Sequence, residues 1–213
     1  MDHELRQIIN SFHNLYYNGL PGEGPIFQRT SWMKVPCAKC PLDLWIYQEI
    51  LAEIKPALVI ETGTYLGGSA LFMAHLMDIF GKGEIITIDI QALPRPHHPR
   101  IRYVTGSSAD AQLISDLLQG RPDEARMVVL DSDHTKEHVL QELKLLAPYV
   151  TLESYLIVED TNINGHPALP TFGPGPYEAV QDFLRSNTNF IVDHSREKLL
   201  MTFNPHGFLK RVK

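Results

Sequence analysis

The chain has 213 residues, a formal net charge of −6 and 44% hydrophobic residues. This length suits one compact domain with an additional segment at one end. The acidic balance argues against a nucleic-acid-binding protein, because such proteins usually carry a basic surface. We find no apolar run of membrane-spanning length and no apolar signal core at the N-terminus. We therefore expect a cytoplasmic protein that does not enter a membrane.

The first forty residues differ in pattern from the rest of the chain. A helix is predicted from Leu5 to Tyr17, and residues 18–25 are rich in glycine and proline, which favours an irregular loop. We predict an N-terminal cap or lid at residues 1–40, built as a layer of helix and loop, and one domain at residues 41–213.

The two cysteines, Cys37 and Cys40, lie three positions apart within that first segment. A zinc site normally needs four ligands, so one such pair is weak support for zinc. We interpret both as reduced thiols in a loop, and the sequence assigns them no function.

Short apolar runs alternate with helical patterns along the rest of the chain. Runs typical of buried strands lie at residues 58–61, 85–89, 101–104, 127–131 and 155–159. Helices are predicted at residues 41–54, 69–79, 109–118, 134–146 and 177–184. This alternation predicts an α/β fold with a doubly wound, mostly parallel sheet. The last two apolar runs, at residues 190–192 and 199–203, predict a C-terminal antiparallel hairpin on that sheet.

A glycine-containing loop follows the first predicted strand, with the sequence Glu61-Thr62-Gly63-Thr64-Tyr65-Leu66-Gly67-Gly68-Ser69. Glycine lets the backbone turn tightly and approach a ligand closely. The spacing differs from the G-x-G-x-x-G pattern of dinucleotide-binding proteins and lacks the Lys-Ser/Thr ending of a P-loop. Asp89 ends the next predicted strand, where a carboxylate accepts hydrogen bonds from ribose hydroxyls. NAD and S-adenosylmethionine both carry that ribose, so Asp89 alone does not distinguish them.

Carboxylates also follow two later strands. Asp131 ends the fourth predicted strand, and Glu159 and Asp160 end the fifth. The ends of adjacent parallel strands meet at one edge of the sheet, where three carboxylates would repel one another without a cation. Their oxygens suit a divalent cation such as Mg²⁺. Asp133 and Asn162 are additional candidate ligands, although Asp133 could instead cap the helix that follows it.

These motifs resemble known families. Val59-Ile60-Glu61-Thr62-Gly63-Thr64 with Gly67-Gly68-Ser69 resembles the first motif of class I methyltransferases. Leu130-Asp131-Ser132-Asp133-His134-Thr135 and Val158-Glu159-Asp160-Thr161-Asn162 resemble the cephalosporin hydroxylase family, which includes proteins labelled rhamnosyl O-methyltransferases. The stretch Lys39-Cys40-Pro41-Leu42-Asp43-Leu44-Trp45 is similar to that family too. The resemblance extends from about residue 30 to the C-terminus and implies a Rossmann-like methyltransferase domain.

The resemblance implies a binding site for S-adenosylmethionine. The cofactor-binding residues that we predict on this basis are Glu61, Gly63, Tyr65, Gly67, Ser69, Asp89, Ser107, Ser108 and Asp131. Of these, Glu61 and Gly63 would line the methionine end of the cofactor. Asp89 would hold the ribose, and the segment Gly106-Ser107-Ser108 would lie near the adenine.

The resemblance also implies a divalent cation, Mg²⁺ or another, bound by Asp131, Glu159 and Asp160. A cation that contacts a hydroxyl lowers its pKa and orients it towards the methyl group. A general base must lie within hydrogen-bond reach of that hydroxyl, and histidines exchange protons near neutral pH. We predict Asp131 and His134 as the catalytic residues, with His166 as the second candidate base. The acceptor is then a small-molecule hydroxyl, and a sugar, a natural product and a catechol-like diol all remain open.

Three alternatives stay open at the level of sequence. An NAD(P)-dependent oxidoreductase would share the fold, but the glycine spacing and the carboxylates argue against it. A hydroxylase with non-haem iron, as the family label suggests, would use two histidines and a carboxylate, for which His134, His138 and Asp131 are candidates. That assignment leaves the glycine loop unexplained. A non-catalytic protein that kept the cofactor pocket is the third alternative.

Two loops are expected to shape the choice of acceptor. They are the N-terminal cap, which contains Trp32, and the segment at residues 162–176. Trp32 and Phe208 are also candidates for exposed apolar residues at a subunit interface, if the chain forms a homo-oligomer.

Overall fold

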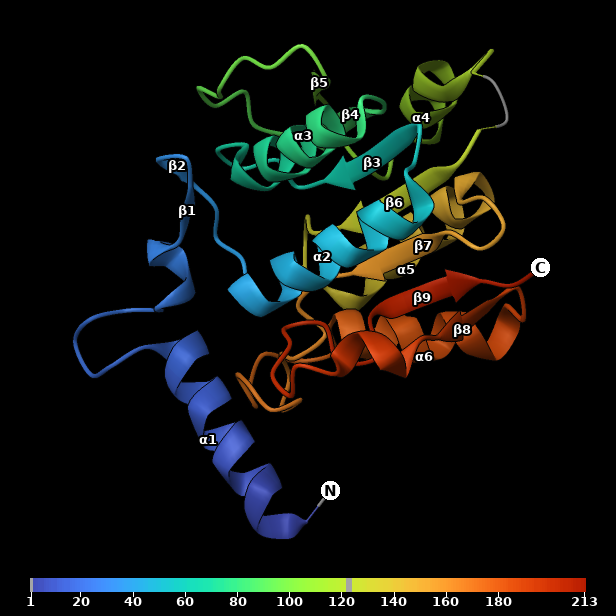
Figure 1. Cartoon of the computed structure of the whole chain (residues 1–213). Helices are drawn as coiled ribbons and strands as arrows, with labels where there is room; N and C mark the ends of the chain where they lie inside the picture. The colour runs from blue at the N-terminus through green and yellow to red at the C-terminus, as the bar shows by residue number, and fades with distance from the viewer. Residues whose placement is uncertain (1, 122–123) are drawn as a thin grey trace.

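The computed structural model describes residues 2–121 and 124–213. Its main feature is a seven-stranded sheet with helices on both faces (Figure 1). The strands are β3 (Leu58–Thr62), β4 (Glu84–Asp89), β5 (Ile101–Thr105), β6 (Arg126–Leu130), β7 (Tyr155–Val158), β8 (Phe190–Val192) and β9 (Phe208–Arg211). They are arranged in the order β5-β4-β3-β6-β7-β9-β8. The first five in this order are parallel, and β9 runs antiparallel to both of its neighbours.

Helices cover the two faces of the sheet in two groups. These helices are α2 (Pro41–Ile54), α3 (Gly68–Phe80), α4 (Ala111–Leu118), α5 (Lys136–Leu146) and α6 (Pro176–Ser186). Successive side chains of a strand point to opposite faces, so Leu58 and Ile60 pack with α4, α5 and α6, whereas Val59 packs with α2 and α3. The structure therefore confirms the predicted doubly wound, mostly parallel architecture.

Local sequence signals explain several helix boundaries. Pro41 occupies the first turn of α2, where its missing N–H costs no hydrogen bond. The carboxylate of Asp110 accepts hydrogen bonds from the backbone N–H groups of Gln112 and Leu113 and so caps α4. Gly81 ends α3 in the left-handed conformation, which glycine adopts without steric cost. These signals are local, which is why the sequence predicted these elements well.

The prediction of the C-terminal hairpin is correct in kind and wrong in position. β8 has an antiparallel partner, but that partner is β9 at Phe208–Arg211 and not the run at residues 199–203. The earlier run forms no strand, and its members Met201 and Phe203 are instead buried in a small apolar cluster with Tyr17. Burial in a loop produces the same apolar pattern as burial in a strand, so the pattern alone misled.

The N-terminal segment contains α1 (His3–Asn18), a short 3₁₀ helix (Phe27–Arg29) and the two-residue strands β1 (Ser31–Trp32) and β2 (Val35–Pro36). α1 projects from the lower left of Figure 1, beside the segment that precedes β9. Tyr17 of α1 packs its ring edge-on against Phe203, at 4.9 Å between centroids. The segment is thus joined to the loops at one end of the sheet. Two 3₁₀ helices complete the described elements, at Ala147–Tyr149 and His194–Glu197.

The two residues predicted as exposed apolar residues at a subunit interface differ in burial. Phe208 is fully buried in the core beneath α2 and α3, so its assignment as an exposed residue is wrong. Trp32 is partly buried. Its ring packs edge-on against Phe72, and its indole N–H donates a hydrogen bond to Nδ1 of His75 at 2.9 Å.

No helix in the described part of the chain combines the length and apolar character needed to cross a membrane.

Candidate active site

The acidic residues singled out in the sequence lie at one edge of the sheet. Thr62 is in register with Ile88 on one side and Leu130 on the other, and Leu130 is in register with Val158. The residues after these strand ends therefore lie next to one another. In this way parallel pairing brings together positions that are far apart in the sequence.

A cavity of about 530 Å³ opens at this edge. Its walls include Gly63, Tyr65, Asp89, Ser108 and Asp131, all of which belong to the predicted cofactor set. The other lining residues are Ile88, Ile90, Gln91, Leu93, Gly106, Ser132, Asp133 and His138. The volume lies in the usual range for small-molecule sites, and the mixture of apolar walls with a few polar groups is typical of them.

Asp89 is held firmly in this cavity. Its two carboxylate oxygens accept hydrogen bonds from the backbone N–H groups of Tyr65 and Gln91, each at 2.8 Å. The guanidinium of Arg95 lies 3.3 Å from one of these oxygens. A carboxylate has about four acceptor positions, so with these three donors in place capacity remains for a ribose hydroxyl.

Glu61 lies below the cavity and is fully buried. Its oxygens accept hydrogen bonds from the hydroxyls of Ser69 at 2.5 Å and Thr87 at 2.6 Å. Burial raises the pKa of Glu61 to about 7, while Lys39 and these hydroxyls act in the opposite direction. The hydroxyl of Ser69 thus helps to position Glu61 by a hydrogen bond, whereas the sequence predicted only that Ser69 belongs to the cofactor-binding set.

Two glycines of the loop are required by neighbouring backbone. Gly63 has a φ of +80°, and a Cβ there would lie 1.8 Å from the carbonyl oxygen of Asp131. A Cβ on Gly68 would lie 2.2 Å from the carbonyl oxygen of Pro36, in the N-terminal segment. Packing therefore explains both glycines, alongside any approach to a ligand. Gly67 also has a left-handed φ, of +81°.

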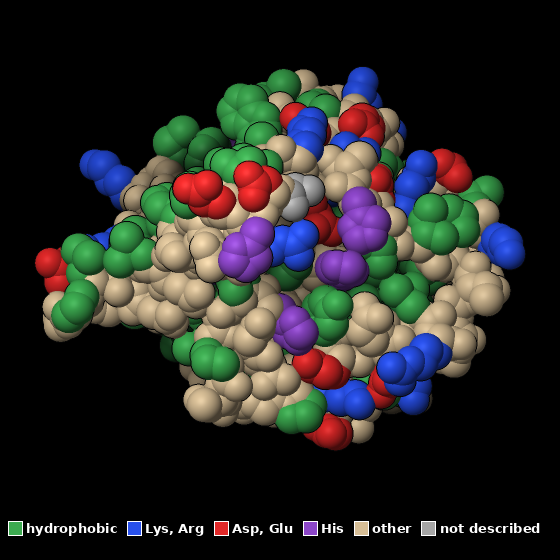
Figure 2. All heavy atoms as spheres, turned by 90° about the horizontal axis from the view of Figure 1, so that it is seen from below, with side chains coloured by type: hydrophobic (Ala, Val, Ile, Leu, Met, Phe, Trp, Pro, Cys, Tyr) green, Lys and Arg blue, Asp and Glu red, His purple; other side chains and the backbone are tan. Residues whose placement is uncertain are grey.

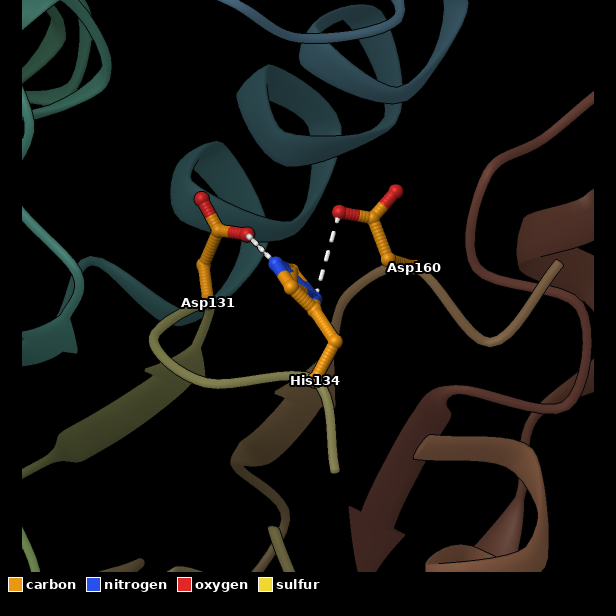
Figure 3. A group of neighbouring side chains, drawn as sticks. All are labelled: Asp131, His134 and Asp160. Carbon is orange, nitrogen blue, oxygen red and sulfur yellow. Dashed lines mark ion pairs between the residues drawn. The ribbon is translucent and has the colours of Figure 1, made fainter. Parts of the chain in front are cut away.

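Asp131, His134 and Asp160 converge at the same edge (Figure 3). His134 Nε2 lies 4.0 Å from Asp131 Oδ1, and His134 Nδ1 lies 3.5 Å from Asp160 Oδ2. One potential ligand atom from each of these residues lies within 4.8 Å of the others, and no other such group occurs in residues 2–121 and 124–213. Burial raises the pKa of both Asp131 and Asp160, and His134 counteracts this for each. These donors suit a divalent cation.

Glu159, the third predicted ligand, is buried behind this group. It accepts a hydrogen bond from the Tyr47 hydroxyl, and its Oε1 lies 2.6 Å from Nζ of Lys39. The same ammonium forms an ion pair with Asp131 Oδ2. Burial alone would lower the pKa of Lys39, but the carboxylates of Asp131 and Glu159 outweigh it and hold this pKa well above its ordinary value. Sequence reasoning missed Lys39 and Tyr47. The only signal for Lys39 was its membership of the stretch at residues 39–45 that carries the family resemblance, and Tyr47 was only one position of the predicted helix at residues 41–54.

The two additional candidate ligands have partners of their own. Asp133 Oδ1 accepts a hydrogen bond from the backbone N–H of Thr135 at 2.7 Å, just before α5 begins. The N-cap of α5 is Thr135, so the interpretation of Asp133 as the cap of that helix is wrong, and its side chain instead stabilises the loop before the helix. Asn162 is fully buried, and its amide nitrogen lies 2.7 Å from Nε2 of His13 on α1.

His138 lines the same cavity but does not belong to this group. Its Nε2 is 3.1 Å from the hydroxyl of Ser132, 3.3 Å from that of Ser108 and 3.5 Å from Glu142 Oε1. The hydrogen bond to Glu142 raises the pKa of His138. The convergent group has two carboxylates and one histidine, which is the reverse of the two-histidine, one-carboxylate set of non-haem iron oxygenases. The structure thus gives no support to the hydroxylase alternative.

His166, the second candidate base, is engaged in another group. Its ring stacks on Tyr177 at 3.8 Å between centroids, and its Nε2 is 3.0 Å from Glu178 Oε1. Tyr177 in turn contacts His206, whose ring contacts His194. Histidine side chains do gather near the middle of one face of the molecule (Figure 2). The contacts of His166 join it to α6 and to the segment before β9.

Ser107, a predicted cofactor-binding residue, has a local partner. Its hydroxyl accepts a hydrogen bond from the backbone N–H of Ala109.

Comparison with known proteins identifies the family. The family model described as Rhamnosyl O-methyltransferase/CmcI matches residues 25–212. The chain belongs to this family. The rhamnosyl O-methyltransferase of Mycobacterium tuberculosis is 42% identical over 214 residues, which cover 96% of this chain and 85% of that protein. The rhamnosyl O-methyltransferase of Mycobacterium leprae is 40% identical over 213 residues, which cover 96% of this chain and 90% of that protein.

Solved structures show the same fold at lower identity. An apo-structure of CmcI superposes with a TM-score of 0.68 at 20% identity and covers 89% of this chain and 79% of that one. The methyltransferase MycE, in complex with Mg, SAH and mycinamycin VI, superposes with a TM-score of 0.55 at 21% identity. That match covers 78% of this chain and 48% of MycE. The Rhamnosyl O-methyltransferase/CmcI family is thus a family of enzymes with the methyltransferase fold, and "cephalosporin hydroxylase" is only a label for it.

Proposed function

We propose that this chain is an S-adenosylmethionine-dependent O-methyltransferase that methylates a hydroxyl of a small molecule with the help of a divalent cation. The observation that carries the proposal is a single sheet edge at which a cofactor-sized cavity meets a convergent group of acidic ligands. Asp131 belongs to both, because it lines the cavity and lies in the group with His134 and Asp160. Relatives that are 40–42% identical and are named O-methyltransferases support this function. Neither the oxidoreductase nor the hydroxylase alternative is favoured.

The residues that line the cavity support a binding site for this cofactor. Gly63 offers a wall without a side chain for the methionine end, and Asp89 offers acceptors for the ribose. Ser108 lies near the place assigned to adenine, and Ile90 and Leu93 add apolar walls there. S-adenosylmethionine, when bound, supplies a methyl group on a positively charged sulfur. Asp131 lies beside Gly63 in the cavity wall, so it would lie near the methionine end of the bound cofactor, where we assign the acceptor.

The donor set fits a hard divalent cation. Asp131 and Asp160 offer carboxylate oxygens to a common point, and Glu159 lies directly behind them. We assign these three residues as the ligands of Mg²⁺ or a similar ion. CmcI has been solved with Mg and SAM, which is consistent with this assignment. The cation, when bound, lowers the pKa of an acceptor hydroxyl and orients it towards the methyl group.

His134 is assigned as the general base. It lies on the loop between β6 and α5, and its side chain is partly exposed beside the two aspartates. This position allows its ring to accept a proton from a hydroxyl held at the same edge. We favour a sugar hydroxyl as the acceptor, because the relatives with the highest identity given above are named for a rhamnosyl substrate. The division into a lid at residues 1–40 and a catalytic domain at residues 41–213 and the homo-oligomeric state are part of the same proposal.

Calorimetric titration tests the cofactor. We expect S-adenosylmethionine and its demethylated product to bind, with and without Mg²⁺, and NADH not to bind. Asp131→Ala is then expected to abolish metal-dependent methyl transfer, with Asp78→Ala, at an exposed ion pair with Arg100, as the matched control. Binding of NADH in place of S-adenosylmethionine would refute the cofactor assignment. Full methyl transfer by Asp131→Ala without added metal would refute the mechanism.

A further inference from the structure

Lys39 is a buried lysine beside the candidate metal site. Only 5% of the residue is exposed, although it lies in the N-terminal segment and far from the sheet in sequence. Its ammonium is paired with Asp131 Oδ2 and with Glu159 Oε1. A buried ammonium is tolerated only when it is paired, so these two contacts hold it there. Two of the three residues assigned as metal ligands are thus already bound to a cation that the protein itself supplies.

The oxygens of the two aspartates are divided between different partners. Asp131 directs Oδ1 towards His134 (Figure 3). Its Oδ2 forms the ion pair with Lys39. Asp160 directs Oδ2 towards His134, and its Oδ1 accepts a long hydrogen bond of 3.4 Å from the Tyr17 hydroxyl. One side of Asp131 therefore faces the convergent group, and the other side faces the ammonium. The carboxylates define two cation positions that share Asp131, and Glu159, whose Oε1 contacts Lys39, would contribute its other oxygen to the divalent ion.

We propose that the ammonium of Lys39 is a permanent cation of this site, which fills one of the two positions and leaves the other for a single divalent ion. Two consequences follow. The site binds one divalent ion and not two, and it binds that ion more weakly than the carboxylates alone would, because like charges repel across a short distance. This inference rests on the proposed function, which requires a divalent ion at this edge.

The direction of the effect follows from the other contacts of the carboxylates. Glu159 keeps the Tyr47 hydroxyl as a donor when the lysine charge is removed. The backbone N–H of Asp131 donates to the carbonyl of Thr62 at 3.1 Å, which fixes the position from which its side chain extends. Loss of the ammonium therefore removes its repulsion of the divalent ion, while the carboxylates stay largely in position. A residue that acted only to orient the carboxylates would have the opposite effect on metal affinity.

Lys39→Met tests this inference, because methionine retains most of the buried stem and removes the charge. Binding of Mn²⁺ is measured by calorimetry, with free Mn²⁺ followed by its paramagnetic resonance signal. We expect one Mn²⁺ per wild-type chain, and one per Lys39→Met chain with a Kd lower by on the order of tenfold. The control is Lys198→Met, which removes a half-exposed lysine that pairs with Glu49 at 2.5 Å. Its Kd for Mn²⁺ should equal that of the wild type.

Lys39→Ala tests the second position directly, since it leaves room for an ion with its water. We expect two Mn²⁺ per chain, with the spin-coupled spectrum of ions about 4 Å apart, as in two-metal sites. A single Mn²⁺ in this variant would overturn the two-position arrangement, and an unchanged or higher Kd in Lys39→Met would overturn the role of the charge. If Lys39→Ala fails to fold, Lys39→Met alone decides the role of the charge. A wild-type chain that binds no Mn²⁺ would refute the proposed function as well, whereas one that binds a single Mn²⁺ with no change in Lys39→Met would refute this inference alone.

Discussion

The position of His134 is compatible with two roles, metal ligand and general base. Its ring nitrogens face the two aspartates at 3.5 Å and 4.0 Å, which suits either a metal ligand or a base beside the metal. A ligand must give one nitrogen to the ion, and its loss weakens metal binding. A base acts on the acceptor, and its loss slows the reaction. Measurements on one variant can therefore distinguish them.

We predict that His134→Ala lowers kcat by about 10²- to 10⁴-fold, the usual contribution of a general base. The Kd for Mn²⁺ should remain that of the wild type. His166→Ala is the matched control and should keep its kcat, because that ring is stacked on Tyr177. A large loss of Mn²⁺ affinity in His134→Ala would instead identify this residue as a ligand.

Asp89→Asn is expected to weaken S-adenosylmethionine binding by about tenfold or more, because a hydrogen bond to a charged acceptor contributes more than one to a neutral group. Asparagine retains the size of the side chain but replaces one acceptor with a donor. Calorimetric titration measures the effect. Asp78→Asn, at an exposed ion pair with Arg100, is the control and should bind the cofactor as the wild type does. Equal affinities in the two variants would show that Asp89 does not hold the ribose.

At the scale of elements, the docking of α1 depends on a buried histidine. His13 is 3% exposed, and its Nε2 lies 2.7 Å from the amide of Asn162 in the loop after β7. Burial lowers the pKa of His13 from 6.5 to about 4. The unfolded chain therefore binds a proton between these pH values that the folded chain does not bind. Stability from this residue is present above pH 6.5 and is lost as the pH falls through 4.

We predict that His13→Gln reduces the loss of stability on acidification. Glutamine stays neutral and can still accept a hydrogen bond from Asn162. Between pH 7 and pH 4 the free energy of unfolding of the wild type should fall by at most about 3 kcal/mol more than that of this variant. The reason is that the pKa of His13 differs by about 2.5 between the folded and the unfolded chain. Thermal unfolding measured at intervals over this range gives both slopes. Equal slopes of stability against pH in the wild type and His13→Gln would contradict the role of His13. The control His3→Gln, at the exposed start of α1, should have the same slope as the wild type.

At the scale of the whole molecule, the proposed cofactor would connect the ends of several strands. The cavity is lined by residues from β4 and from the segments that follow β3, β4, β5 and β6. A ligand that binds there contacts the folded state and not the unfolded chain. Its binding free energy is therefore added to the free energy of unfolding.

We predict that S-adenosylhomocysteine at 100 times its Kd raises the free energy of unfolding by about 2.7 kcal/mol. For a chain of this size the Tm should rise by roughly 5–10 °C. Thermal unfolding with and without the ligand measures the shift, and NADH at the same concentration should produce none. At that same ligand concentration Asp89→Asn should show a smaller shift, and a full shift would contradict the assignment of the ribose contact.

The sequence by itself determined the alternation of strands and helices, the glycine loop and the acidic strand ends at Asp89, Asp131 and Asp160. These features depend on local periodicity and on the rule that parallel strands end at one edge, so they can be read along the chain. Tertiary structure alone decided that the strand paired with β8 is β9, and that residues 199–203 are a buried loop. The run at residues 199–203 is the more apolar of the two, because β9 contains Lys210 and Arg211, so composition favours the wrong partner and only the rest of the fold selects the right one.

Tertiary structure also decided the surroundings of the carboxylates. Lys39 lies 92 residues from Asp131, Tyr47 lies 112 residues from Glu159, and both come from outside the motifs that contain those acids. No local pattern records such contacts, because they arise when the N-terminal segment and α2 pack against the completed sheet. The sequence therefore predicted which acids gather at the sheet edge, whereas the fold decided which cation and which hydroxyl accompany them. The physical reason is that strand ends are set by neighbours in the chain, while the charge balance of a buried site is set by neighbours in space.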